Sequence, residues 1–197
     1  MQDLYTLAAD DLASRLLAHA RHMPAVPRAL EFARARHAGQ KRADGTDYIL
    51  HPLRVALILW EIGGVKDPNM LAAALLHDTV EDGGADAFDV EDAFGHKVGD
   101  LVRAMTLPPL NPGESKHQRA CRYFEHLAWE GRDPQILRSA DRLDNLRTLD
   151  GVLGREREAE YLQESRELLL PLTLACNTAL YHALSAALEA RAARLGA

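Results

Sequence analysis

Cysteine is scarce in this 197-residue chain, where only Cys121 and Cys176 occur. Two cysteines in stretches that look helical build neither a disulfide framework nor a zinc site based on thiolates. Long hydrophobic runs are also missing, because the longest, such as 71–76, are far shorter than the roughly 18 residues of a membrane-spanning helix. Three aspartates within the first eleven residues are untypical of an export signal. These absences predict a soluble, unexported, cytoplasmic protein.

Positive charge is in deficit. The chain has 23 Lys and Arg residues against 29 Asp and Glu residues, which gives a formal net charge of −6. Because nucleic acids and membrane surfaces are anionic, this balance argues against binding to either of them. An anionic ligand would therefore need a local cation or a basic pocket.

Strand patterns are absent as well. Alternating apolar and polar runs rich in Val, Ile, Thr and aromatic residues do not occur, whereas Leu and Ala recur at spacings of three and four between Gly and Pro. No repeat or linker divides the chain. We predict an all-α fold, a single domain over 1–197 with about eight to ten helices. Its motif-bearing core covers about 29–161, with an N-terminal helix in 1–27 and C-terminal helices in 162–197.

The expected helices are separated by Gly, Pro and short polar segments. They cover about 4–22, 28–37, 52–62, 68–77, 86–94, 97–106, 114–130, 134–149, 155–170 and 171–195. The 68–77 helix is apolar nearly all round, which predicts that it is the buried central helix. Pro171 lacks a backbone donor, so it is expected either to separate the last two helices or to kink a single one.

Ionisable residues gather where the predicted central helix ends. The segment 77–82 reads His-Asp-Thr-Val-Glu-Asp, and burying such groups costs on the order of several kcal/mol unless a partner such as a divalent cation compensates. His51 and Asp141 fit the same site. Two imidazoles and two carboxylates suit Mn²⁺, Fe²⁺, Co²⁺, Ni²⁺ or Zn²⁺, whereas the lack of thiolates disfavours structural zinc. The spacing does not choose among these metals.

Four sets of residues then form a recognisable combination: Arg42, Gly45 and Tyr48-Ile49-Leu50-His51-Pro52; 73–82 (AALLHDTVED); Phe94-Gly95; and 140–148 (ADRLDNLRT). Together they resemble the HD-domain phosphohydrolases, specifically the single-domain small alarmone hydrolases of the RelA/SpoT type. The resemblance covers about 29–161.

That resemblance implies a set of metal ligands and a reaction. The implied ligands of one divalent ion, usually Mn²⁺, are His51, His77, Asp78 and Asp141. The implied reaction removes pyrophosphate from the 3′ position of ppGpp or pppGpp and leaves GDP or GTP, as a guanosine-3′,5′-bis(diphosphate) 3′-pyrophosphohydrolase does.

Glu81 and Asp82 are the implied catalytic pair that handles the attacking water. Elementary chemistry agrees, because a divalent ion lowers the pKa of a bound water and polarises a phosphoryl oxygen. A carboxylate nearby then accepts the proton or orients the water. Glu81 and Asp82 lie three and four residues after Asp78, and the division of roles between them stays open.

The resemblance also implies contacts with the nucleotide. It places Arg42 near the phosphates or the base, Asn145 and Thr148 near the sugar and its 3′ substituent, and Arg157 with Tyr161 at the far end. Asn145 and Thr148 follow Asp141 by four and seven residues, so the three share a helical face. Arg157 and Tyr161, four apart, share another. Lys116 and Arg138 are weaker candidates for a distal phosphate.

The chain departs from the usual pattern near its His-Pro motif. Ala43 stands where many alarmone hydrolases have Lys, and Asp47 stands where Pro usually precedes Tyr48. With Asp44, these changes make the loop more negative and predict weaker affinity or an altered base preference. The partner is thus a small-molecule nucleotide: a guanosine alarmone first, with ppApp, NADPH or another nucleotide as alternatives.

Two further alternatives remain. The chain could be a non-catalytic nucleotide-sensing module, although all six metal and catalytic residues are present. Leu180, Leu184 and Leu188 recur at spacings of four, which is typical of core packing or of a dimer seam, so a homo-oligomer stays open. The residues after Tyr161 leave no room for a synthetase domain, so we expect no bifunctional enzyme.

Overall fold

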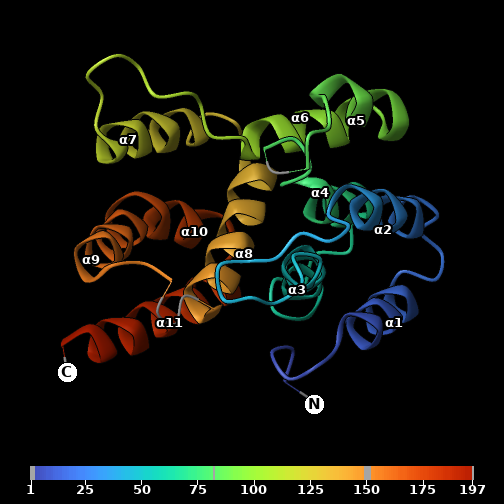
Figure 1. The fold of residues 1–197 in the computed structure, drawn as a ribbon, viewed down its shortest axis with the longest axis horizontal. Helices are drawn as coiled ribbons and strands as arrows, with labels where there is room; N and C mark the ends of the chain where they lie inside the picture. Colours follow the sequence, from blue (N-terminus) through green and yellow to red (C-terminus); the bar gives the residue numbers. More distant parts are fainter. Residues whose placement is uncertain (1–2, 82, 149–151, 197) are drawn as a thin grey trace. The chain divides into compact units, whose positions relative to one another are not determined.

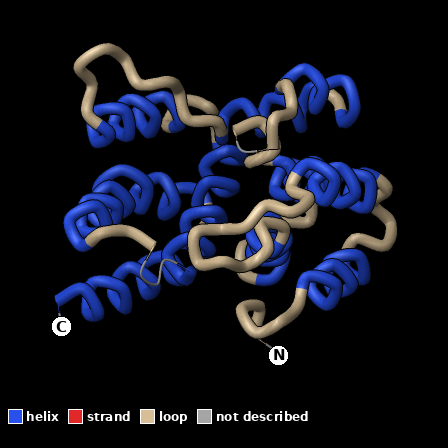
Figure 2. The backbone as a smooth tube through the Cα atoms, viewed as in Figure 1, coloured by secondary structure: helices blue, strands red, loops and turns tan. Residues whose placement is uncertain are grey.

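The computed structural model describes residues 3–81, 83–148 and 152–196. Within these segments the chain forms helices joined by loops, and one isolated antiparallel bridge pairs Lys41 with Asp47 (Figure 2). The predicted all-α fold is confirmed. None of the helices formed by these residues is long and apolar enough to cross a membrane. The chain divides into two compact units, Met1–Thr106 and Leu107–Ala197, which we describe separately.

Six helices make up the first unit (Figure 1). They are α1 (Ala9–His19), α2 (Ala25–Arg36), α3 (Leu50–Glu61), α4 (Pro68–Leu76), α5 (Ala87–Phe94) and α6 (His96–Met105). Helix α4 packs against α2, α3 and α6, whereas α1 packs on α3 and α5 on α6. Helix α4 is therefore central to this unit, as its apolar sequence predicts.

Local sequence signals explain where α4 begins. The Asp67 side chain caps the helix by accepting a hydrogen bond from the Asn69 amide at 2.8 Å, and Pro68 occupies the first turn. Every residue from Met70 to Leu76 is buried. The helix thus delivers the two residues that follow it, His77 and Asp78, to a fixed place at its C-terminal end.

Three predicted helix starts in this unit differ from the structure, and the second helix begins at Ala25 rather than near residue 28. The first helix begins at Ala9 rather than near residue 4, because Asp3 holds the preceding segment in a turn by accepting hydrogen bonds from Tyr5 and Thr6. The third begins at Leu50 rather than at Pro52, since the Leu50 amide already donates to the Asp47 carbonyl. Pro52 nevertheless lies in the first turn, where its missing N–H costs no intrahelical bond.

The second unit holds the remaining helical segments (Figure 1). They are α7 (Lys116–Leu127), α8 (Arg132–Thr148), α9 (Arg155–Glu164), the π-helix η1 (Ser165–Leu169), α10 (Leu170–Cys176) and α11 (Thr178–Gly196). Helix α8 packs against α10 and α11, and α7 packs against α9 and η1. Leu180, Leu184 and Leu188 of α11 are buried within this unit, as core packing predicts.

The helix is not interrupted at Pro171, where the sequence predicts a break or a kink; it ends six residues later. The chain runs without interruption from α9 through η1 into α10, where Pro171 takes a first-turn position that needs no amide donor. The helix ends instead at Asn177, whose backbone is extended (φ −155°, ψ 101°). The Asn177 side chain caps α11 by accepting a hydrogen bond from the Leu180 amide at 3.0 Å.

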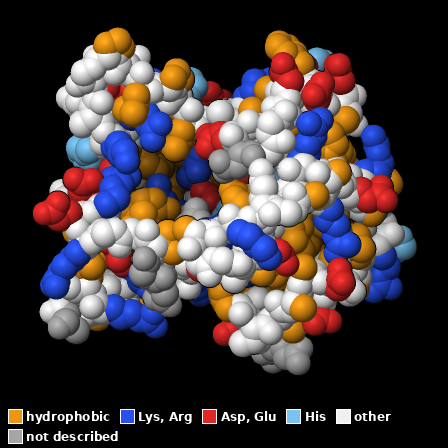
Figure 3. Space-filling view, in the orientation of Figure 1, with side chains coloured by type: hydrophobic (Ala, Val, Ile, Leu, Met, Phe, Trp, Pro, Cys, Tyr) orange, Lys and Arg blue, Asp and Glu red, His pale blue; other side chains and the backbone are white. Residues whose placement is uncertain are grey.

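Charged side chains of both signs are interspersed on the face shown in Figure 3. Some form surface pairs, such as Lys97 with Asp67 at 2.6 Å and Arg34 with Asp10 at 2.8 Å. Exposed pairs of this kind contribute little to stability. The core of each unit, rather than its surface charge, holds the fold together.

Leu57→Ala tests the core of the first unit. The Leu57 side chain on α3 is fully buried, so its truncation is expected to lower the free energy of unfolding by about 2–5 kcal/mol. Leu174→Ala is the matched control, because Leu174 is 52% exposed. Urea unfolding followed by circular dichroism measures both variants, and equal losses would contradict the assignment of Leu57 to the core.

Candidate metal centre

Two helix ends bring three of the predicted ligands together. His51 is the second residue of α3, His77 directly follows α4, and Asp78 comes next. Since α3 and α4 pack against each other, the N-terminal turn of one meets the C-terminal end of the other. His51, His77 and Asp78 form a cluster able to hold a metal ion, with one potential ligand atom of each within 4.8 Å of the others.

The distances within this cluster are short. His51 Nε2 lies 3.2 Å from His77 Nε2, which in turn lies 3.2 Å from Asp78 Oδ1. His51 Nε2 lies 3.5 Å from Asp78 Oδ2. Both imidazoles are almost fully buried, whereas the Asp78 side chain is 19% exposed. The cluster therefore has one solvent-accessible side, on the carboxylate.

The donor atoms fit a first-row divalent metal. His77 Nδ1 lies 2.9 Å from the Ala74 carbonyl, which can only accept, so Nδ1 carries the proton and Nε2 presents a lone pair. Bonds of about 2.1 Å at angles between square and tetrahedral separate two ligand atoms by about 3.0–3.4 Å. The observed separation of 3.2 Å between the two Nε2 atoms falls in this range.

Tyr48 and His37 support the cluster, and sequence reasoning gave neither of them this role. The Tyr48 hydroxyl donates a hydrogen bond of 2.8 Å to Asp78 Oδ2. The His37 ring stacks on the Tyr48 ring with centroids 4.5 Å apart, and His37 Nδ1 lies 2.8 Å from Gln40 Oε1. His37 is buried, so its ring packs beneath Tyr48 rather than in solvent. The sequence feature that could have pointed to Tyr48 is its position three residues before His51, within the same motif.

Tyr48→Phe is expected to weaken metal binding by about 10- to 100-fold, because it removes a hydrogen bond that orients the Asp78 carboxylate and leaves the ring stack intact. Tyr181→Phe, on α11, is the matched control and should bind metal as the parent chain does. Equilibrium dialysis of both variants against Mn²⁺ gives the comparison. Unchanged affinity in Tyr48→Phe would show that Asp78 needs no such orientation.

Asp141, the fourth predicted ligand, belongs to the second unit. On α8, its Oδ2 accepts a hydrogen bond of 2.7 Å from Arg138 Nη1, and its Oδ1 accepts one of 2.7 Å from Asn145 Nδ2. Arg138 Nε also donates to the Tyr123 hydroxyl at 2.7 Å. Burial lowers the pKa of Arg138, but Tyr123 and Asp141 outweigh it and raise the pKa above its usual value. Asp141 is thus held by two neighbours, and its role as a ligand stays a prediction.

The catalytic pair is only partly described. Glu81 is exposed in the turn that follows Asp78. Asp82 lies outside the described residues. Glu81 lies three positions after Asp78, so a short segment of chain keeps it near the cluster.

The predicted substrate residues are placed as follows. In the first unit, the Arg42 guanidinium lies 5.8 Å from the centroid of the Tyr48 ring. In the second unit, the Thr148 hydroxyl donates to the Asp144 carbonyl at 2.9 Å. Arg157 pairs with Glu160 and Glu164 at 3.0 and 3.1 Å. These roles in substrate binding stay predictions.

Tyr161 has a different environment from its predicted helical partner Arg157. The Arg142 guanidinium stacks 3.9 Å from the centroid of the Tyr161 ring. Arg142 Nη1 also donates to the Ser165 hydroxyl at 2.7 Å. Arg157 and Tyr161 lie on one helix, α9, as expected, and their contacts within the second unit are separate.

The two carboxylates near Ala43 both have local partners. The Asp47 carboxylate pairs with Lys41 Nζ at 2.5 Å. The Asp44 carboxylate accepts hydrogen bonds from the Thr46 amide and hydroxyl at 2.9 and 2.6 Å. Burial raises the pKa of Asp44, but those hydrogen bonds and nearby arginines outweigh it and leave the pKa below its usual value. Asp44 is therefore ionised at neutral pH, and Asp47 is partly neutralised by Lys41.

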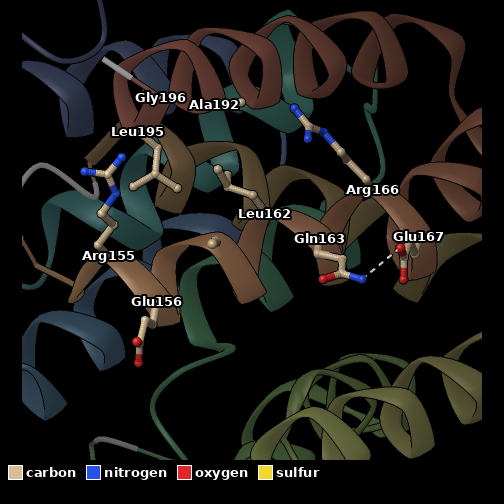
Figure 4. A pocket seen from close by; sticks show the side chains of 10 residues that line it. Arg155, Glu156, Leu162, Gln163, Arg166, Glu167, Ala192, Leu195 and Gly196 are labelled. Carbon is tan, nitrogen blue, oxygen red and sulfur yellow. Dashed lines mark hydrogen bonds between the residues drawn. The ribbon is translucent and has the colours of Figure 1, made fainter.

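A hollow of about 850 Å³ lies between α9 and α11 in the second unit (Figure 4). Leu162, Ala192 and Leu195 provide apolar contacts, and Arg155 and Arg166 stand at its edge. No histidine lines this hollow. It is therefore distinct in chemistry from the His51–His77–Asp78 cluster.

Comparisons with known proteins agree on one family. A family described as "HD domain" matches residues 29–175. A guanosine-3′,5′-bis(diphosphate) 3′-pyrophosphohydrolase from Aquifex aeolicus is 36% identical over 165 residues, and a probable GTP pyrophosphokinase from Mycobacterium leprae is 42% identical over 150 residues. These alignments cover 83% and 75% of this chain but 23% and 18% of the relatives, so the chain spans about a fifth of their length.

A solved structure gives broader coverage. It is described as a metazoan ortholog of SpoT that hydrolyses ppGpp, and it matches with a TM-score of 0.74 and 30% identity over 85% of this chain and 95% of that one. The Listeria monocytogenes protein lmo0812 matches with a TM-score of 0.56 at 26% identity, over 72% and 97% of the two chains. The family match extends across both compact units. This chain therefore belongs to the HD-domain family.

Proposed function

We propose that this protein is a metal-dependent phosphohydrolase that removes the 3′-pyrophosphate of ppGpp or pppGpp and leaves GDP or GTP. The observation that carries the proposal is the His51–His77–Asp78 cluster, whose donor atoms are spaced as ligands of one ion. The names of the Aquifex relative and of the metazoan SpoT ortholog support the same reaction and substrate.

His51, His77, Asp78 and Asp141 are the proposed ligands, and Mn²⁺ is the proposed ion. The nitrogen and oxygen donor set, without thiolate, suits Mn²⁺. When bound, the ion would polarise a phosphoryl oxygen and make water easier to deprotonate. Ala74 and Tyr48 orient His77 and Asp78 for that purpose through their hydrogen bonds.

Glu81 and Asp82 are the proposed proton acceptors for the attacking water. The exposed position of Glu81 next to the cluster supports this role, because its carboxylate can take up a proton and release it to solvent. Asn145 and Thr148 are proposed to contact the sugar and its 3′ substituent, Arg42 the phosphates or the base, and Arg157 with Tyr161 the far end. We place the protein in the cytoplasm, in the stringent response, without nucleic acid as a partner.

Turnover of several nucleotides tests the proposal. Metal-stripped protein is incubated with ppGpp, ppApp, NADPH and a deoxynucleotide, with and without Mn²⁺, and pyrophosphate and phosphate are separated. We expect Mn²⁺-dependent release of pyrophosphate from ppGpp. Turnover of ppApp instead would connect Ala43 to base choice. Phosphate release from NADPH or a deoxynucleotide would contradict the proposed substrate, and no turnover at all would favour a nucleotide-sensing module.

A further inference from the structure

Helix α7 carries a second group of metal-ligating side chains, separate from the cluster in the first unit. His117 and Cys121 lie one helical turn apart on α7, and Cys121 Sγ lies 3.6 Å from His117 Nε2. Glu125 follows one turn later on the same helix. Neither His117 nor Cys121 has a role in the proposed hydrolysis.

The spacing of the two donor atoms matches a metal chelate. Zinc binds thiolate at about 2.3 Å and imidazole at about 2.0–2.1 Å in tetrahedral geometry, which separates sulfur from nitrogen by about 3.5–3.6 Å. The observed separation of 3.6 Å matches this value. A weak S–H···N hydrogen bond has the same separation. The charges around the pair therefore have to distinguish a metal chelate from a simple hydrogen bond.

The surroundings of the pair favour a cation. Glu164 Oε1, which is buried on α9, lies 3.5 Å from His117 Nδ1. Glu164 also pairs with Arg157 at 3.1 Å, so its charge is shared between the two partners. The carboxylate oxygen near Nδ1 still favours the imidazole tautomer with the proton on Nδ1, which leaves the Nε2 lone pair facing the thiol. A histidine that binds metal through one nitrogen characteristically has a carboxylate near the other.

The electrostatic field at the sulfur points the same way. Burial raises the pKa of the Cys121 thiol, and the carboxylates of Glu125, Glu164 and Glu167 raise it further. The nearby negative charge makes the free thiolate unfavourable, which disfavours Cys121 as an activated nucleophile. The same charge attracts a divalent cation, which would replace the thiol proton.

The sequence predicts no zinc site based on thiolates, but the contact between His117 and Cys121 changes that expectation. We propose that His117 Nε2 and Cys121 Sγ form a second metal site on α7, which takes a borderline divalent ion such as Zn²⁺ or Co²⁺. On binding, the S–H bond breaks, its proton leaves to solvent, and the sulfur electron pair forms the bond to the metal. Water completes the coordination. Because the pair supplies a thiolate and the first cluster does not, the two sites differ in the metals that they prefer.

Titration of the full chain with Co²⁺ tests this site, because a thiolate bound to Co²⁺ gives a charge-transfer absorption in the near ultraviolet that histidine and carboxylate ligands do not give. We expect this absorption in the parent chain at one equivalent of bound metal. Cys121→Ser should abolish it. His117→Gln should weaken Co²⁺ binding at this site by at least about tenfold. Removing a residue that only hydrogen-bonds to a metal ligand already lowers metal affinity by about 10- to 100-fold, and His117 is itself a proposed ligand.

Cys176→Ser is the matched control, since Cys176 is the other cysteine and is buried. It should keep the full absorption. His51→Ala should keep it as well, which separates this site from the proposed hydrolytic centre. Absence of the absorption in the parent chain, its persistence in Cys121→Ser, or unchanged Co²⁺ affinity in His117→Gln would each overturn the proposal. None of these readouts depends on turnover of a nucleotide.

Discussion

His77→Ala is expected to abolish Mn²⁺ binding at the first cluster and to reduce hydrolysis by about 10³-fold or more. The His77 imidazole contributes one of two buried nitrogen donors, and its Nδ1 is fixed by the Ala74 carbonyl. A metal's stabilisation of charge in a phosphoryl-transfer transition state is worth on the order of several kcal/mol, so its loss removes most of the rate enhancement.

Metal content and turnover are measured together for this variant. His126→Ala is the matched control, because the His126 side chain is 73% exposed on α7. Thermal unfolding of His77→Ala separates loss of the ligand from loss of the fold. A folded variant that keeps both its metal and its activity would refute the ligand role of His77.

Glu81→Gln is expected to keep the metal and to lose turnover by about 10²- to 10⁴-fold, the range for removal of a general base. The amide has nearly the shape of the carboxylate but accepts no proton at neutral pH. Glu81 is exposed, so the substitution removes no side chain from the core. Substrate saturation curves measure kcat and KM, and we expect the loss in kcat.

Glu130→Gln, in the exposed bend after α7, is the matched control and should be as active as the parent chain. Loss of metal from Glu81→Gln equal to that of His77→Ala would contradict separate roles for a base and a ligand. Full activity would instead assign the proton transfer to Asp82.

The centre of the first unit was predictable because its signals are local. Asp67 and Pro68 mark the start of α4, an unbroken apolar run makes it buried, and the abrupt change at His77 marks the place where ionisable groups meet the core. The clustering of His51 with His77 and Asp78 agrees with the ligand set that the family resemblance implies. Ionisable groups at the end of a buried helix need a compensating partner, so the sequence alone favoured a metal site there.

Other features depend on contacts between distant parts of the sequence. Tyr48 meets Asp78 across thirty positions, and no local pattern reveals such a pair. The break at Asn177 was missed because proline is a stronger local signal than an asparagine cap, although here Pro171 fits a first turn without cost. The described chain divides into two compact units, and the assignment of both to a single domain stays a prediction.

The π-helix Ser165–Leu169 gives the long helical segment an extra residue within one turn. That residue sets the phase between the start of the π-helix and the helix that follows it. Ser165, the first residue of the π-helix, meets Arg142, and the Thr173 hydroxyl on α10 lies 2.7 Å from that of Ser139. Deleting one residue inside this turn would convert it to a regular α-helix, whereas deletion elsewhere would rotate one buried face toward solvent by about 100°. Natural length variation in this helix should therefore be concentrated in this single turn.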